Sequence, residues 1–184
     1  MAYTLITANR NYSSWSLRPW LLMRALDIPF EERFEGFARS DNHAAFRAFS
    51  PSGQVPVLID GDRTIWDSMG ITLYLAERHP GIWPAEEAAR AWAMCAVAEM
   101  HGGFGALRND CPMNVGVRIA PKPPSPGLSR QIARLGGSGP RGCRALAAPG
   151  SPARPFPRSM PFMRQSPFGC GPMGLTWAPR GPAG

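Results

Sequence analysis

The stretch "SPSGQVPVLIDGDRTIWDSMGITLYLAERHP", Ser50 to Pro80, decides the fold. It contains two short apolar runs joined by Asp60-Gly61, a pair of residues that is a strong signal of a β-hairpin. A helical pattern follows, with Asp67 or Ser68 as its N-cap and Pro80 as its stop. The stretch therefore predicts two paired strands and then a helix.

The residues before this stretch predict two strands, each followed by a helix. "YTLIT", Tyr3 to Thr7, is a short apolar strand, and Leu17 to Leu26 has apolar residues at helical spacing. "IPFEERFE" has a second strand pattern, and Asn42 to Phe49 suggests a short helix. The predicted order is β α β α β β α, which is an α/β unit with a hairpin at its edge.

A second, helical unit begins after Pro80. Pro84 and the pair Glu86-Glu87 are typical of a helix start, because acidic side chains favour the positive end of a helix. We predict one long helix from there to Asn109, weakened by several glycines, and a further helix over Leu128 to Leu135. The expected domains are residues 1–81 (α/β), 84–135 (partial all-helical) and 136–184 (a low-complexity tail).

Charge separates the tail from the body of the chain. All thirteen acidic residues, with ten arginines, lie at or before Asp110, whereas the other ten basic residues follow it. Fifteen of the 21 prolines also follow it, and such Pro and Gly density without a period is typical of disorder. The ten basic residues are scattered with few aromatics between them, so we expect no nucleic-acid partner.

The four cysteines, Cys95, Cys111, Cys143 and Cys170, show neither a CxxC pair nor a metal-ligand spacing. Nothing resembles a signal peptide or a membrane span. We therefore expect a cytoplasmic protein with reduced thiols, no metal and no membrane partner, and we disfavour a thioredoxin-type oxidoreductase.

Two helix starts carry candidate site residues. In "NYSSWS", Asn11 to Ser16, either Ser14 or Ser16 would serve as the cap. Either choice leaves Ser13 or Ser14 at a positive helix end, where a hydroxyl can donate to a bound anion such as a thiolate. In "WDSMG", Asp67 can pair with an ammonium, and Ser68 begins a helix whose free N–H groups can hold a carboxylate. Simple capping is the alternative in both places.

A third candidate is the segment "SGQVPVL", Ser52 to Leu58, which places Pro56 at the entry of a strand. A cis Val55-Pro56 bond would be one way to turn a backbone edge toward a ligand, and a plain loop proline is the alternative.

Together, "NYSSWSLRPWLLMRALDIPFEE", the stretch Ser50 to Pro80 and "WPAEEAARAWAMCAVAEMHGGFGALRNDCPMN" resemble the bacterial cytosolic glutathione S-transferases. The SSxS pattern is most similar to the zeta-like, serine-using branch, which includes maleylacetoacetate isomerases. The resemblance implies an α/β thioredoxin-like N-terminal lobe and an all-α C-terminal lobe, which is truncated here and followed by a disordered tail. It also implies glutathione as co-substrate, a small electrophile as acceptor, and a homodimer.

Position by position, the resemblance assigns Ser13 or Ser14 to the glutathione sulfur. It assigns Gln54 and the backbone of Val55, before a cis Pro56, to the cysteinyl unit. Asp67 and Ser68 would hold the amino and carboxylate groups of the γ-glutamyl end. Trp15 stands where the branch often has Cys, and with His101 it is a candidate for lining the acceptor pocket.

The implied activity is transfer of glutathione to a small electrophile, or isomerisation of the maleylacetoacetate type. A glutathione-binding or interaction module without catalysis, or an inactive truncated product, is the alternative.

The tail after Leu135 departs from the family. Codons can be chosen for Ser159 to Thr176 that, read from the third base, give DAFYAPVAFRVRTYGLD, which is similar to the helix that the family has there. We therefore interpret the tail as a frame-shifted reading of the normal gene.

Overall fold

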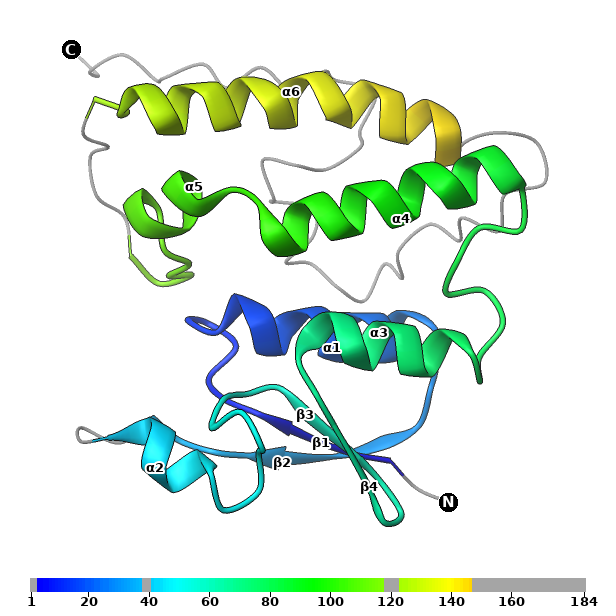
Figure 1. Ribbon diagram of the computed structural model, residues 1–184, viewed down its shortest axis with the longest axis vertical. Coiled ribbons are helices and arrows are strands. Elements are labelled where there is room, and N and C mark those ends of the chain that lie inside the picture. Colours follow the sequence, from blue (N-terminus) through cyan, green and yellow to red (C-terminus); the bar gives the residue numbers. More distant parts are fainter. Residues whose placement is uncertain (1–2, 38–40, 118–122, 147–184) are drawn as a thin grey trace.

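The computed structural model describes residues 3–37, 41–117 and 123–146. Figure 1 shows two layers, an α/β unit below and a pair of long helices above. The elements follow in the order β1 (Tyr3–Thr7), α1 (Ser14–Ala25), β2 (Phe30–Phe34), α2 (Asn42–Phe46), β3 (Val57–Asp60), β4 (Arg63–Trp66), α3 (Ser68–Ala76), α4 (Glu87–Gly102), α5 (Gly105–Asp110) and α6 (Pro126–Leu146).

The four strands form one mixed sheet in the order β2-β1-β3-β4. β1 and β2 run parallel with α1 as their crossover, while β3 is antiparallel to both β1 and β4. Gly61, in the turn of the β3–β4 hairpin, has φ +60°, which explains why a glycine stands at that position. The α/β order and the hairpin predicted from the sequence are confirmed.

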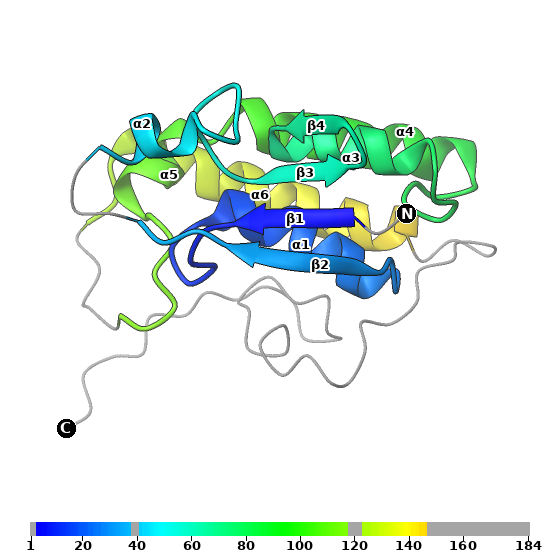
Figure 2. The same cartoon turned by 90° about the horizontal axis from the view of Figure 1, so that it is seen from below.

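The core of this unit lies between the sheet and the helices α1 and α3, which share one face of the sheet (Figures 1 and 2). Leu5 of β1 is opposite Leu58 of β3, and both side chains are fully buried. Met23 of α1, Ile28 before β2, and Ile71 and Leu75 of α3 complete the buried cluster. Burial of these apolar side chains is the main stabilising term for the unit, because removal of apolar area from water drives folding. The arrangement is a thioredoxin-like lobe.

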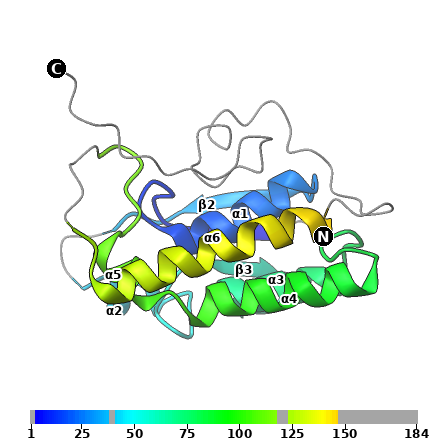
Figure 3. The ribbon, with the colours of Figure 1, turned by 90° about the horizontal axis from the view of Figure 1, so that it is seen from above.

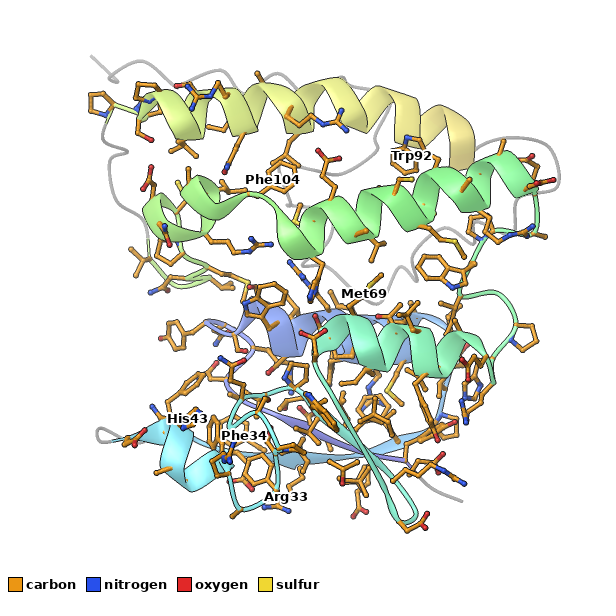
Figure 4. All side chains as sticks on the ribbon, in the orientation of Figure 1. Arg33, Phe34, His43, Met69, Trp92 and Phe104 are labelled. Atoms are coloured by element: carbon orange, nitrogen blue, oxygen red, sulfur yellow. The ribbon has the colours of Figure 1, made fainter. Side chains whose placement is uncertain are left out.

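The helices α4 and α6 pack against each other over α1 and α3, as Figures 1 and 3 show from two sides. The side chains of Trp92 and Phe104 lie between them (Figure 4). An ion pair between Arg134 of α6 and Glu99 of α4 joins the same two helices. α4 has one fully buried side chain, Ala89, whereas Met94 is 41% exposed. The side chains of α4 are therefore less buried than those in the core of the α/β unit.

The prediction of one long helix to Asn109 is wrong, because the chain breaks between α4 and α5. Gly103 has extended backbone, and a Cβ added there would lie 2.6 Å from the carbonyl oxygen of Glu99. Phe104 follows in the left-handed region with φ +60°, and its side chain is buried. The close backbone approach at Gly103 ends the helix, and the buried Phe104 fixes the direction in which α5 starts.

Two further boundaries differ from the prediction. α1 starts at Ser14 with Ser13 as its N-cap, so neither Ser14 nor Ser16 is the cap, and Pro19 lies inside the helix. α6 runs past Leu135 to Leu146, starting at Pro126, a residue that suits the first turn of a helix. The tail residues 147–184, on which the frame-shift interpretation rests, lie outside the described residues.

Candidate functional site

A pocket of about 710 Å³ opens beside the N-terminal ends of α1 and α3. α2 and the loop before β3 form further walls, and His101 borders the pocket from α4. Its lining includes all the predicted site residues except Ser14, namely Ser13, Trp15, Gln54, Val55, Pro56, Asp67, Ser68 and His101. Residues separated by as much as 88 positions in the chain therefore meet at one place.

Ser13 is both the N-cap of α1 and part of the pocket wall. Its hydroxyl accepts a hydrogen bond from the backbone N–H of Ser16 at 3.3 Å and lies 2.9 Å from the Ser16 hydroxyl. Ser16, which is completely buried, in turn accepts from the backbone N–H of Ala8 at 3.2 Å. A chain of hydrogen bonds thus runs from the end of β1 to the Ser13 hydroxyl at the pocket.

The Val55-Pro56 bond is cis, as the resemblance implies. The buried Ser50 organises the segment before it, because its hydroxyl accepts from the backbone N–H of Gln54 at 3.2 Å. Ser50 Oγ also lies 3.1 Å from the hydroxyl of Ser52. These contacts hold the Gln54-Val55-Pro56 backbone beside the pocket.

The two carboxylate oxygens of Asp67 have different partners. Oδ1 accepts from the backbone N–H groups of Met69 and Gly70 at 2.7 and 3.3 Å, which caps α3. Oδ2 lies 3.6 Å from Nε2 of His101 on α4. Asp67 has φ +70° and ψ +138°, a positive φ outside the left-handed helical region, and Ser68 beside it is buried.

Trp15 and His101 bring the two layers together at the pocket. Their rings meet edge to face with centroids 5.4 Å apart. The guanidinium groups of Arg18 and Arg108 lie 4.1 and 4.9 Å from the centre of the Trp15 ring. Arg108 also donates to the carbonyls of Met100, His101 and Gly103, so it closes the C-terminal end of α4. Trp15 therefore anchors the helical layer to the start of α1.

Sequence reasoning missed several lining residues, including His43 of α2 and Gly53. Figure 4 labels His43 on α2, beside one end of the sheet. Gly53 has φ +67°, and a Cβ there would lie 2.6 Å from the His43 ring. The sequence holds no local signal for this pairing, since a lone histidine on a short helix has many ordinary explanations. The other missed lining residues are Phe37, Asn42, Phe46, Ser52 and Trp66.

Within the described ranges, no group of three or more His, Cys, Asp and Glu side chains is placed to hold a metal ion. Cys95 and Cys111 are both exposed and free. No helix of the described part of the chain is long and apolar enough to cross a bilayer. The polar groups that line the pocket include hydroxyls, the Asp67 carboxylate and two imidazoles.

Parts of the chain are similar in sequence to known proteins. A dichloromethane dehalogenase of Methylophilus leisingeri is 55% identical over 55 residues, which cover 29% of this chain and 21% of the relative. A zeta-class glutathione S-transferase of Euphorbia esula is 32% identical over 92 residues, covering 48% of this chain and 41% of the relative. The matches to these curated relatives thus span less than half of their length.

Among solved structures, the theta-class glutathione S-transferase of Xanthomonas axonopodis pv. citri with glutathione bound superposes with a TM-score of 0.57. It is 25% identical in sequence, and the match covers 80% of this chain and 71% of that one. The similarity therefore extends to both the zeta and the theta class. Residues 12–78 match the family model described as "Glutathione S-transferase, N-terminal domain".

Proposed function

We propose that the chain is a glutathione transferase, which binds glutathione in the pocket, stabilises its thiolate and transfers the sulfur to a small electrophile. The observation that carries the proposal is the meeting of two helix N-termini at one pocket, α1 with Ser13 and α3 with Asp67 and Ser68. Helix N-termini favour anions, and glutathione offers a thiolate and two carboxylates.

The γ-glutamyl end fits the start of α3. Since Oδ1 of Asp67 already accepts two backbone N–H groups, Oδ2 is the oxygen that would accept the ligand ammonium. The Ser68 hydroxyl and the first turn of α3 would then hold the neighbouring carboxylate. Gln54 and the Val55 backbone border the pocket between the two helix ends and would hold the cysteinyl unit. For the remaining glycyl carboxylate, we propose His43 of α2.

The thiolate would be stabilised by the Ser13 hydroxyl. In the structure the Ser13 hydroxyl donates to Ser16 Oγ, which also accepts from the backbone N–H of Ala8. When glutathione binds, the Ser13 proton would turn to the sulfur, and the Ser16 hydroxyl would donate to Ser13 Oγ in its place. Hydrogen bonds in such a chain polarise one another, which strengthens the last one. Hydrogen bonding to the charged form lowers the pKa of a thiol and raises the thiolate fraction at neutral pH.

In the transfer step, the thiolate sulfur forms a bond to an electrophilic carbon, and a leaving group departs with its electron pair. Isomerisation of the maleylacetoacetate type would instead use reversible addition of the same sulfur to a double bond. Ser13 donates without ionising in both cases, so the site needs no metal and no separate base for its nucleophile. We further propose a homodimer, as the family implies.

Comparison of Ser13→Ala with Ser14→Ala tests the proposal. With glutathione and a panel of electrophiles, Ser13→Ala is predicted to lose most of the turnover. Ser14→Ala should lose little, because Ser14 does not border the pocket. Equal turnover in the two variants would contradict the hydroxyl mechanism.

A non-catalytic glutathione-binding module is the second candidate, favoured by the sparse burial of α4. Saturable glutathione binding without turnover of any electrophile, in wild type and both variants alike, would support it.

A further inference from the structure

The Glu32 carboxylate on β2 accepts hydrogen bonds from three different segments of the chain. Its Oε1 accepts from the hydroxyl of Thr7, the last residue of β1, at 2.7 Å, and from the guanidinium of Arg10 in the loop between β1 and α1. Its Oε2 accepts from Nε1 of Trp20 on α1 at 3.1 Å. One carboxylate therefore joins the end of β1, the loop that follows it and the helix to which that loop leads.

These contacts lie outside the pocket, whose described lining includes none of the four residues. The side chains of Arg10 and Glu32, which form an ion pair, are 33% and 22% exposed. The Arg10 guanidinium also stacks on the Trp20 ring, 4.5 Å from its centre. Partly exposed ion pairs usually contribute little to stability, so the main effect of these contacts is to fix where Arg10 lies.

Arg10 belongs to a tight turn that ends at Ser13. The carbonyl oxygen of Asn9 accepts from the backbone N–H of Tyr12 at 3.0 Å and from that of Ser13 at 2.7 Å. Because Arg10 lies inside this turn, its contact with Glu32 restrains the turn. The turn in turn sets the position of the Ser13 backbone, from which the hydroxyl extends.

The Ser13 hydroxyl is the group that we assign to the glutathione sulfur. A hydrogen bond weakens as the donor turns away from its acceptor, so a small displacement of Ser13 would weaken its bond to the thiolate. Ser16 holds Ser13 from the helix side. Groups at a reacting centre need such support from residues around the site, and the Arg10 contact supplies it from the loop side.

We propose that Glu32 is a positioning residue for the transfer reaction, which acts through Arg10 to hold the turn Asn9 to Ser13 so that the Ser13 hydroxyl is aimed at the sulfur. This inference rests on the proposed function and adds to it a residue outside the pocket. Neither Glu32 nor Arg10 touches the ligand in this account. Their substitution should therefore change the thiol pKa of bound glutathione and leave affinity for the rest of the ligand intact.

Glu32→Gln and Arg10→Met test the proposal, because they change the charge of the chain in opposite directions. If charge alone acted on the thiol, loss of the negative Glu32 would lower the thiol pKa and loss of the positive Arg10 would raise it. If both residues hold Ser13, each substitution weakens the same hydrogen bond, and each raises the pKa.

The measurement is titration of the thiolate absorbance of glutathione bound to the full chain. We expect its midpoint to move up by about half a pH unit or more in each variant, the scale of a weakened hydrogen bond to a charged group. The Kd of S-methylglutathione, which has no thiol to ionise, should stay within about twofold of the wild-type value.

A double variant tests whether Glu32 acts through Arg10. Glu32→Gln combined with Arg10→Met should titrate at the same pH as Arg10→Met alone, because two substitutions that break one contact are not additive. Arg10→Lys keeps the positive charge without the planar fork, so it should titrate between wild type and Arg10→Met. Additive shifts in the double variant would contradict action through Arg10.

Glu35→Gln and Arg33→Met are the matched controls. Arg33 of β2 donates from Nε to Oε1 of Glu35 at 2.7 Å, so these two side chains form an ion pair with each other at the end of the same strand. Both controls should keep the wild-type titration. Thermal unfolding checks that every variant folds, and Arg10→Met with Arg10→Lys decides the question if Glu32→Gln does not fold.

An unchanged thiol pKa in Arg10→Met or in folded Glu32→Gln would overturn the positioning role, and so would shifts in opposite directions. The proposed function survives either result as long as Ser13→Ala raises the thiol pKa. If glutathione does not bind, or if Ser13→Ala leaves the thiol pKa unchanged, the proposed function itself fails, and the role of Glu32 with it.

Discussion

Nε2 of His101 on α4 lies 3.6 Å from Oδ2 of Asp67, the residue that caps α3. The pair joins the helical layer to the thioredoxin-like lobe at the edge of the pocket. Since the other oxygen of Asp67 holds the start of α3, one carboxylate serves both the local fold and the site. These two tasks can be separated by substitution.

Asp67→Asn is predicted to weaken glutathione binding while the fold stays intact. Asn is as good an N-cap as Asp and has nearly the same shape, so the thermal midpoint should change little. The variant loses the negative charge that would pair with the ligand ammonium, so Kd for glutathione should rise by roughly tenfold or more. Calorimetric titration measures it.

Asp41→Asn is the control for this experiment, because Asp41 caps α2 in the same way and does not line the pocket. Its affinity for glutathione should equal that of wild type. Wild-type affinity in Asp67→Asn would show that the carboxylate does not pair with the ligand.

Ser16→Ala is predicted to raise the pKa of bound glutathione's thiol. The substitution removes the hydroxyl that links Ala8 to Ser13, so Ser13 becomes a weaker donor to the sulfur. It also leaves a buried N–H group without a partner, which costs about 1 to 3 kcal/mol of stability. Titration of the thiolate absorbance in the complex measures the pKa, with Ser14→Ala as the variant expected to leave it unchanged. An identical thiol pKa in Ser16→Ala and wild type would rule out the relay.

Acid is predicted to loosen the start of α4 through Glu86. Hydrogen bonds from the backbone N–H groups of Ala88 and Ala89 lower the pKa of this exposed carboxyl below its ordinary value. The contribution of Glu86 to stability is therefore complete above its unfolded-state pKa, about 4.3, and is lost as the pH falls through the lower folded-state pKa.

Glu86→Gln should accordingly be less stable than wild type at neutral pH and equal to it in strong acid. Urea unfolding at both pH values measures the difference. Glu87→Gln is the control, since Glu86 and not Glu87 accepts the two N–H groups. A stability difference for Glu86→Gln that does not change with pH would contradict the assignment.

Much of the thioredoxin-like lobe could be predicted because its signals are local. The Asp60-Gly61 turn and the capping Asp67 each specify backbone geometry within a few residues, and the hairpin and α3 form where the sequence predicts them. The start of α1 could not be chosen in this way, because neighbouring serines are equally good caps. Tertiary contact decides it: burial of Ser16 against Ala8 leaves Ser13 as the cap.

The pocket lining could be predicted for residues at a helix start or a strand entry, and could not be predicted for residues that packing alone brings to the pocket. The His43 ring packs directly against Gly53, where a Cβ would clash with it. This contact joins the short helix α2 to the loop before β3, so no local pattern in the sequence predicts it. The break before α5 likewise depends on Gly103 approaching the Glu99 carbonyl, whereas helix propensity alone favours continuation.

The coding DNA around Leu135 tests the frame-shift interpretation of the tail. We predict an open alternative frame that, over Ser159 to Thr176, spells a helix similar to that of the family. Stop codons in that frame, or a sequence without helical pattern, would contradict the interpretation. A repaired chain should then cover the half-exposed Met94 side of α4, which protection from proteolysis can report.

The central claim is that the pocket recognises glutathione through its γ-glutamyl end. Its most direct test is calorimetric titration of the full chain with glutathione and, separately, with cysteinylglycine, which lacks the γ-glutamyl group. The account predicts saturable binding of glutathione at one site per chain and a far weaker response to cysteinylglycine. Equal affinities, or no saturable binding of glutathione, would contradict it.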